Sequence, residues 1–456
     1  MTESESRGAI LSNTALFVRS VGQLAEYDPQ RQPTGHKLTH FEVMAAYGPS
    51  AIAEISEYGS AILMESRNAV GQALASRRMA LGLGQNEFAK ATGNSVDIIR
   101  AAEEAPETMP IHQLERLAIR LGLDERRLAI DREAGADANL GVRLRVLADA
   151  PISQGPRLST SAVLLLAEAA ALTMIAERLR EWLGESFFWR SFKASPDYGS
   201  YLSPAYTVGY SLAEQARSIL KLESGPIRSM RDLVEERLGL TVIQGHLGDA
   251  FAGATIANGQ ARGIVLNIDG ANQKPWVRRA TLAHELGHLL FDPNERLNQV
   301  RVDTYNDDPA SEKDFVEQRA NAFAVAFLAP PEAVRARFDV PSPNLKEDDV
   351  TSIVEEFGIS PTATRYHLQN IFYRTTDAPL VRRDIDDSQW RAEEDFTLDF
   401  FKPDSTSPQR RGRLSKTVVQ AFDEGLITDD TAALYLDMTT IDFHESVETL
   451  RSIWNS

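Results

Sequence analysis

Apolar residues recur at spacings of three and four throughout residues 68–129, a pattern that predicts a bundle of four or five short helices. Gly or Pro interrupts the pattern between successive segments, where each helix is expected to end. The segments are "VGQALASRRMALG", "GQNEFAKATG", "SVDIIRAAEE" and "IHQLERLAIRLG". We therefore expect a separate helical unit at residues 67–130.

Three further stretches have helical patterns. The apolar run at 161–176 is interrupted by Glu168 and falls short of the roughly 20 residues that a membrane span needs, so we expect a buried core helix. Residues 49–66 are compatible with one helix near the N-terminus. Residues 345–371 predict a second helix-turn-helix, because a Gly turn and a Ser-Pro helix start separate two helical patterns.

The hydrophobic period changes after residue 238. Short β-branched segments divided by Gly predict the strands of a small sheet, namely "LTVIQGHL", "GATIAN" and "ARGIVLNID". Helical patterns return at 274–290 and 313–328, with the acidic loop "VDTYNDDPASEKD" between them. The predicted fold class is mostly α with a small β-sheet, that is, α+β.

A chain of 456 residues is long enough for about three domains. The changes in pattern divide it into an N-terminal region without a readable role at 1–66, a helix-turn-helix bundle at 67–130, a helical connector at 131–212, a core of sheet and helices at 213–340, a second helix-turn-helix-like unit packed on that core at 341–375, and a linker with a C-terminal helical region at 376–456.

The composition limits the chemistry that is available. Hydrophobic residues make up 43% of the chain and charged residues 25%, as in a globular protein. The absence of cysteine excludes disulfides, thiolate ligands and a cysteine nucleophile, so a metal would have to be held by His, Asp or Glu. The N-terminus lacks the basic and apolar regions of a secretory signal, and we expect a cytoplasmic protein without a membrane segment.

The net charge of −17 argues against nucleic-acid binding by the surface as a whole, because phosphate contacts need local positive charge. Residues 67–127 are the exception, with nine basic and eight acidic residues. DNA binding is therefore considered for that segment alone.

The sequence "HELGH" offers candidate metal ligands. His284 and His288 are four residues apart, which on a helix places both imidazoles on one face, within reach of one ion. Glu285 is placed to take a proton from a water molecule whose pKa the ion lowers. Gly287 is costly inside a helix, and we expect it to leave room for the metal and its water.

A third ligand has to come from elsewhere in the chain. Glu317 begins the apolar helix "FVEQRANAFAVAFLAPP", and Asn321 lies one turn further along the same face, where its amide could orient a histidine ligand. The acidic loop offers the alternatives Glu312, Asp314 and Asp303, none of which opens so apolar a helix.

These motifs, with "GLTVI" and "GIVLNID" before them, resemble the ImmA/IrrE family of metallopeptidases over about Ala213 to Ile371. The resemblance implies a zincin fold with Zn²⁺ on His284, His288 and Glu317, and Glu285 as general base. It also implies a protein substrate, since known members of the family act on repressor proteins.

Residues 71–128 resemble the XRE (lambda-repressor-like) helix-turn-helix family. The resemblance implies DNA contacts through Gln85, Asn86, Ser95 and Arg100, with Arg77, Arg78 and Lys90 on phosphates, and a homodimer of such units would suit a palindromic site. The presumed recognition helix is poor in bidentate donors and carries Asp97, so the alternative is a helical module that serves packing or docks a protein partner.

We expect the second helix-turn-helix to pack on the core rather than to read DNA, although its second helix carries Thr362, Thr364, Arg365 and His367. Of the remaining histidines, His36 and His40 are also four residues apart, but the pair has no glutamate between them and no helical context, and surface or core positions are expected for His36, His40, His112, His246 and His444.

The sequence thus predicts an intracellular zinc endopeptidase with a helix-turn-helix module, which cleaves a repressor or antitoxin-like protein in a stress, prophage or phage-defence response. One alternative is a DNA-binding transcriptional regulator whose peptidase fold serves as a sensor. Another is a latent proteolytic toxin or defence effector.

Overall fold

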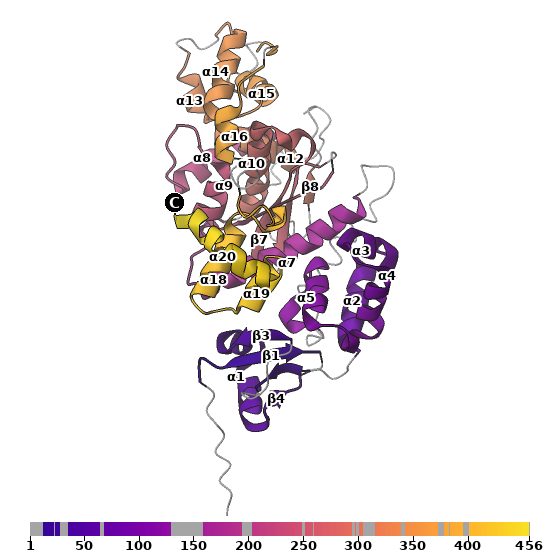
Figure 1. Ribbon diagram of the computed structural model, residues 1–456. Helices are drawn as coiled ribbons and strands as arrows, with labels where there is room; N and C mark the ends of the chain where they lie inside the picture. The colour runs from indigo at the N-terminus through magenta and orange to yellow at the C-terminus, as the bar shows by residue number, and fades with distance from the viewer. Residues whose placement is uncertain are drawn as a thin grey trace, which may run out of the picture. The chain divides into compact units, whose positions relative to one another are not determined.

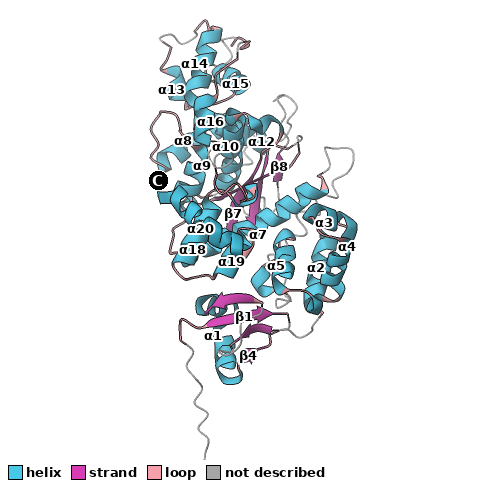
Figure 2. Ribbon diagram, in the orientation of Figure 1, coloured by secondary structure: helices cyan, strands magenta, loops and turns pink. Residues whose placement is uncertain are grey.

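The computed structural model describes residues 12–21, 23–27, 35–63, 68–128, 158–193, 203–248, 251–258, 260–293, 297, 301–303, 315–338, 343–372, 378–382, 384–394 and 401–455. The chain forms two compact units. The first contains Met1–Glu185 and Lys402–Ser456, and the second contains Ser186–Phe401. The fold is mostly α with two small sheets, one in each unit, which confirms the predicted α+β class (Figure 1, Figure 2).

The first unit begins with an antiparallel sheet that the sequence analysis did not predict. Its strand order is β3-β1-β2-β4, with β1 at Leu16–Ser20, β2 at Gln23–Glu26, β3 at His36–Thr39 and β4 at Ser60–Ala61. Helix α1 (His40–Tyr58) packs on this sheet around Phe17, Val43 and Ile55.

The helix predicted at 49–66 was right at its start and wrong at its end. The backbone of Gly48 is non-helical (φ 79°, ψ 177°), so a second part of the kinked helix α1 begins at Pro49. Thr39 and Glu42 form a capping box that begins α1 at His40, and Gly59 ends it with a φ of 80°. Residues 60 and 61 then extend into β4 rather than continuing the helix.

The predicted helical bundle is confirmed. It consists of α2 (Ala69–Ala80), α3 (Gln85–Thr92), α4 (Val96–Glu104) and α5 (Ile111–Arg120), with short 3₁₀ turns at Pro106–Thr108 and Glu125–Arg127. Gly71 allows α2 to approach α4, because a Cβ there would lie 2.2 Å from the carbonyl oxygen of Glu103.

The apolar run forms the long buried helix α7 (Thr160–Trp182). Glu168 lies inside this apolar helix because its carboxylate pairs with Arg120 and with the buried Arg410. No helix among the described residues is long and apolar enough to cross a membrane.

The C-terminal helical region also belongs to the first unit. It contains the 3₁₀ turn Pro408–Arg410 and helices α18 (Arg413–Asp423), α19 (Asp429–Tyr435) and α20 (Thr440–Asn455). The start of α19 covers the outer edge of β3, where the amide of Lys37 donates to Asp430 at 3.0 Å and Thr428 donates to the carbonyl of Lys37 at 2.7 Å. An edge strand that would otherwise be open is thereby closed by side chains.

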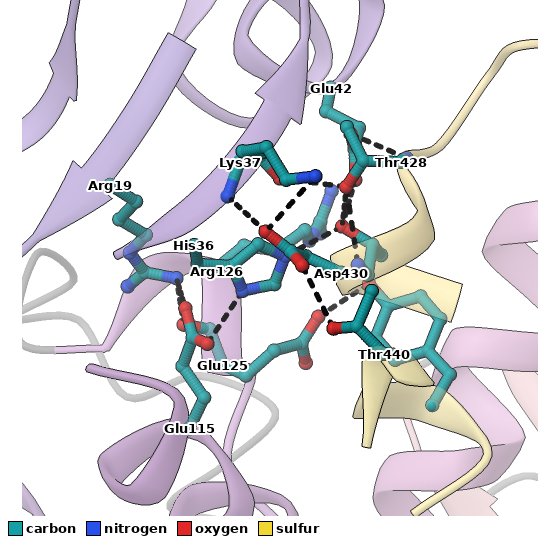
Figure 3. A network of polar contacts seen from close by, with 12 residues as sticks. Arg19, His36, Lys37, Glu42, Glu115, Glu125, Arg126, Thr428, Asp430 and Thr440 are labelled. Atoms are coloured by element: carbon teal, nitrogen blue, oxygen red, sulfur yellow. Dashed lines mark hydrogen bonds and ion pairs between the residues drawn. The ribbon is translucent and has the colours of Figure 1, made fainter. Parts of the chain in front are cut away.

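A buried polar network links β3, α5 and α19 (Figure 3). One nitrogen of His36 contacts Glu115 at 2.6 Å, and the other contacts Thr431 at 2.8 Å. Burial disfavours the charged imidazole, but the contact with Glu115 outweighs it and raises the pKa of His36. Burial likewise opposes ionisation of Glu115, and the contact with His36 nevertheless lowers the pKa of that carboxyl. The ion pair of His36 with Glu115 therefore joins β3 to α5, and the hydrogen bond of His36 with Thr431 joins β3 to α19 near the other end of the sequence.

The second unit contains the three predicted strands and a fourth. Strands β5 (Thr241–Gly245) and β7 (Ala261–Asn267) are parallel, and the sheet continues antiparallel through β6 (Gly253–Asn258) to β8 (Arg301–Asp303). The last two residues of strand β8, Val302 and Asp303, lie in the segment predicted as an acidic loop, so that prediction was wrong for these two residues. Their pairing with β6 is non-local and has no signature in so short a segment.

Helices surround this sheet. They are α8 (Ala205–Ile219), α9 (Met230–Asp232) with the following π-turn Leu233–Leu238, α10 (Pro275–Phe291), α12 (Phe315–Leu328), α13 (Pro331–Arg335), α14 (Glu347–Phe357), α15 (Pro361–Ile371) and α16 (Ser388–Glu394), with 3₁₀ turns at Phe188–Ser191 and Gly270–Gln273. Helix α8 packs closely on α12 at Gly209, which has no side chain. A Cβ at this position would lie 2.4 Å from the carbonyl oxygen of Arg319, so a larger residue would push the helices apart.

The second helix-turn-helix consists of α14 and α15, and its polar residues face inward. Thr364 and His367 are fully buried. The ring of His367 contacts the hydroxyl of Tyr210 and the carbonyl oxygen of Ala329, and Arg365 donates to the carbonyl of Ala378. These side chains serve packing within the second unit.

Candidate metal centre

Helix α10 carries the "HELGH" motif through the interior of the second unit. Pro275 occupies its first turn, where a missing N–H costs nothing, and nearly the whole helix is buried. His284 and His288 lie one turn apart, and their Nε2 atoms are 3.1 Å from each other. Local helical geometry alone produces this pairing.

Helix α12 supplies the third group. Oε2 of Glu317 lies 3.3 Å from Nε2 of His284 and 3.3 Å from Nε2 of His288. The structure therefore brings the three predicted ligands together, and they form the one group of His, Asp or Glu residues with metal-binding geometry found among the described residues.

The second nitrogen of each imidazole is held by a polar side chain. Nδ1 of His284 donates to Oδ1 of Asn321 at 2.9 Å, and Nδ1 of His288 donates to Oδ2 of Asp292 at 2.9 Å. Arg319 in turn pairs with Asp292, and both side chains are buried. Because a neutral imidazole carries one proton, these bonds leave the Nε2 lone pairs directed toward Glu317.

The electrostatics of the cluster favour an ionised Glu317. Burial opposes its charge, but the contacts of its Oε2 with the Nε2 atoms of His284 and His288 outweigh burial and hold the pKa of Glu317 far below its usual value. Burial also disfavours a charged His288, whose pKa is nevertheless raised by Asp292 and Glu317. A concentrated negative charge beside two imidazoles is the environment that a divalent cation would neutralise.

Glu285 lies beside the cluster and is 1% exposed. It accepts a hydrogen bond from the hydroxyl of Thr255 on β6. The predicted general base is thus buried on the same helix as the two histidines, one residue after His284.

Residues 236–369 match the family model of the IrrE N-terminal-like domain, a peptidase family. This IrrE-like region contains the whole sheet together with α10 and α12. The match supports a metallopeptidase of the ImmA/IrrE kind, and this family implies a metal and a protein substrate. No curated protein matches the chain.

The IrrE-like region also contains two residues that the sequence analysis missed. Asp292 follows His288 by four residues, so its position on the same helical face was readable from the sequence. Arg319 is two residues from Glu317, and only the packing of α12 against the end of α10 shows that it reaches Asp292.

The expectation that Gly287 leaves room for the metal was wrong. A Cβ at this position would lie 2.7 Å from Cδ1 of Phe323, so the space beside Gly287 is filled by an aromatic ring. Gly287 therefore serves the packing of α10 on α12. Of the alternative ligands, Glu312 and Asp314 lie outside the described residues, as does the side chain of Asp303.

Three of the four residues expected to contact DNA make contacts within the bundle. Gln85 donates to Glu103 at 2.8 Å, Ser95 caps α4 by accepting from the amide of Ile98, and Arg100 pairs with Asp97 at 3.1 Å. Asn86 is exposed on α3.

The expectation that Arg77 and Arg78 contact phosphates was wrong. Both are less than 10% exposed, and Arg78 is paired with Glu103 at 2.6 Å. These two arginines are held in the interior by the packing of α2 on α4, while Lys90 is exposed. Arg77 and Arg78 therefore do not contribute exposed positive charge to this segment.

Proposed function

We propose that this chain is a zinc-dependent endopeptidase that cleaves a regulatory protein. His284, His288 and Glu317 are the proposed ligands and Glu285 the proposed general base. The observation that carries the proposal is the convergence of three ligand atoms at 3.1 to 3.3 Å from one another.

These separations fit a tetrahedral ion. With bonds of about 2.0–2.1 Å to nitrogen and oxygen, tetrahedral geometry places ligand atoms about 3.3 Å apart. Two histidines and one glutamate are a donor set used by zinc peptidases, in which the fourth position stays open. The hydrogen bonds to Asn321 and Asp292 fix both rings in the tautomer that metal binding needs.

The proposed reaction is hydrolysis of a peptide bond. When bound, the ion supplies Lewis acidity, which polarises the scissile carbonyl and lowers the pKa of water. Glu285 takes a proton from the attacking water and returns it to the amine that leaves. Asn321 and Asp292 keep the imidazoles oriented while these transfers occur.

The proposed substrate is a repressor or antitoxin-like protein. This part of the proposal is supported by the IrrE-like match, together with the resemblance to peptidases that act on repressors. The helix-turn-helix bundle is proposed as a module that docks a protein partner, because Arg77 and Arg78 are buried within it and its presumed recognition helix carries the exposed Asp97.

Metal analysis of the purified chain tests the site. We expect about one zinc per chain for the wild type, and loss of zinc in His284→Ala and in Glu317→Ala. Glu285→Gln is the matched control, because it lies in the same motif and should keep the metal. A wild-type chain without zinc under non-chelating conditions would remove the site assignment.

A further inference from the structure

The proposed base has a partner on the neighbouring sheet. The hydroxyl of Thr255, on β6, lies 2.5 Å from Oε2 of Glu285. Thr255 is 0% exposed and Glu285 is 1% exposed, so the contact is shielded from bulk water. A hydrogen bond to a carboxylate in such a place is of the strong, charge-assisted kind.

The local sequence explains this contact. Alternate residues of a strand share a face, so Gly253 and Thr255 both point toward α10. On α10, Thr281 and Glu285 lie one turn apart on the facing side. A Cβ at Gly253 would lie 2.8 Å from Cγ2 of Thr281 and 3.5 Å from Cγ of Glu285. The glycine therefore lets the helix approach the strand until the hydroxyl two residues later reaches the carboxylate.

From this geometry we infer that Thr255 is a positioning residue for Glu285, an inference that rests on the proposed peptidase function. The terminal torsion of a glutamate is broad, so a hydrogen bond to one carboxylate oxygen narrows the orientations that the group adopts. Thr255 holds Oε2 of Glu285 and thereby sets the direction of the other carboxylate oxygen, Oε1. A hydroxyl can donate to an ionised carboxylate and accept from a protonated one, so it holds Glu285 before and after proton transfer.

The test uses the full-length chain loaded with Zn²⁺ and measures the binding of acetohydroxamate by calorimetry. This probe chelates zinc and presents a proton donor to a neighbouring carboxylate, so its affinity reports the orientation of Glu285. Thr255→Val removes the hydroxyl with little change of shape and should weaken binding about tenfold or more. Thr255→Ser keeps the hydroxyl and should bind as the wild type does.

Thr281→Val is the matched control. Thr281 is buried between α10 and β6, as Glu285 is, but its hydroxyl bonds to Asn272 and to the carbonyl of Val277 rather than to Glu285. This variant should keep the affinity of the wild type. A loss equal to that of Thr255→Val would overturn the inference, since any buried hydroxyl would then have the same effect.

A double-mutant cycle separates positioning from general packing. In the Glu285→Ala background, Thr255→Val should cause no further loss, because the side chain that Thr255 orients is gone. Thr255→Ala replaces Thr255→Val if the valine variant unfolds at a lower temperature than the wild type. A fully additive loss in the cycle would contradict the inference.

The outcomes distinguish this inference from the proposed function. If Thr255→Val binds both zinc and acetohydroxamate as the wild type does, Thr255 has no positioning role and the peptidase proposal stands. If the wild-type chain takes up no zinc, the peptidase proposal fails and the role of Thr255 falls with it.

Discussion

The hydrogen bonds from Nδ1 of His284 to Asn321 and from Nδ1 of His288 to Asp292 should contribute unequally to the zinc affinity. Asp292 is 3% exposed, and its carboxylate accepts from His288 in the interior. Asn321 is exposed on α12, and its neutral amide accepts from His284. We therefore compare Asp292→Ala with Asn321→Ala.

The expected magnitudes follow from charge and exposure. A hydrogen bond to a charged group contributes about 1.5–3 kcal/mol, and a neutral one about 0.5–1.5 kcal/mol. At 1.36 kcal/mol for each factor of ten, Asp292→Ala should weaken zinc binding on the order of 10- to 100-fold. Asn321→Ala should weaken it only about threefold, because water can take the place of the exposed amide.

A competition titration against a zinc-binding dye at pH 7.5 measures both affinities. Asp292→Ala also leaves Arg319 buried without its carboxylate partner, so the double variant Asp292→Ala/Arg319→Leu controls for an unpaired charge. Equal losses in the two single variants, or a larger loss for Asn321→Ala, would refute the reasoning from burial and charge.

Two further predictions concern stability. The pKa of His36 is raised, so its contact with Glu115 stabilises the fold fully below the ordinary histidine pKa of 6.5, and this contribution is lost as pH rises through the folded value. The pKa of Glu115 is lowered, so its contribution is present above 4.5 and is lost as pH falls through its folded value. Thermal unfolding between pH 5 and pH 9 should show the alkaline decline in the wild type and a flatter profile in His36→Gln; identical profiles would contradict this role. Gly287→Ala should destabilise the second unit by about 1–3 kcal/mol because of the clash with Phe323. Denaturant titration checks this, and Phe323→Leu in the same chain should restore part of the loss; an unchanged midpoint in Gly287→Ala would show that the ring moves aside freely.

The sequence predicted those features of the site that depend on local periodicity. The spacing of His284 and His288 is a property of one helix, and the distance from Glu317 to Asn321 is a property of another. Their meeting at one point depends on the packing of α10 on α12, which the resemblance to a known family implied and which spacing alone does not determine. Thr255 was missed because its contact with Glu285 joins a strand to a helix across 30 residues.

Non-local contacts also explain the errors in the fold. The N-terminal sheet has strands of two to five residues, which are too short for a clear alternating pattern. One edge of that sheet is covered by residues about 390 positions away, such as Asp430 against Lys37. Gly287 was interpreted as open space because its neighbour, the ring of Phe323, lies on a different helix.

The most direct test of the proposed function compares cells that express the wild-type chain with cells that express Glu285→Gln, with the zinc content of both proteins confirmed. New protein N-termini are measured by proteomics in each. We expect a small set of N-termini, from a regulatory protein, that appears with the wild type and is absent with Glu285→Gln. The same set in both strains, or no new N-terminus with a zinc-loaded wild type under any inducing condition, would contradict the assignment of this chain as a peptidase.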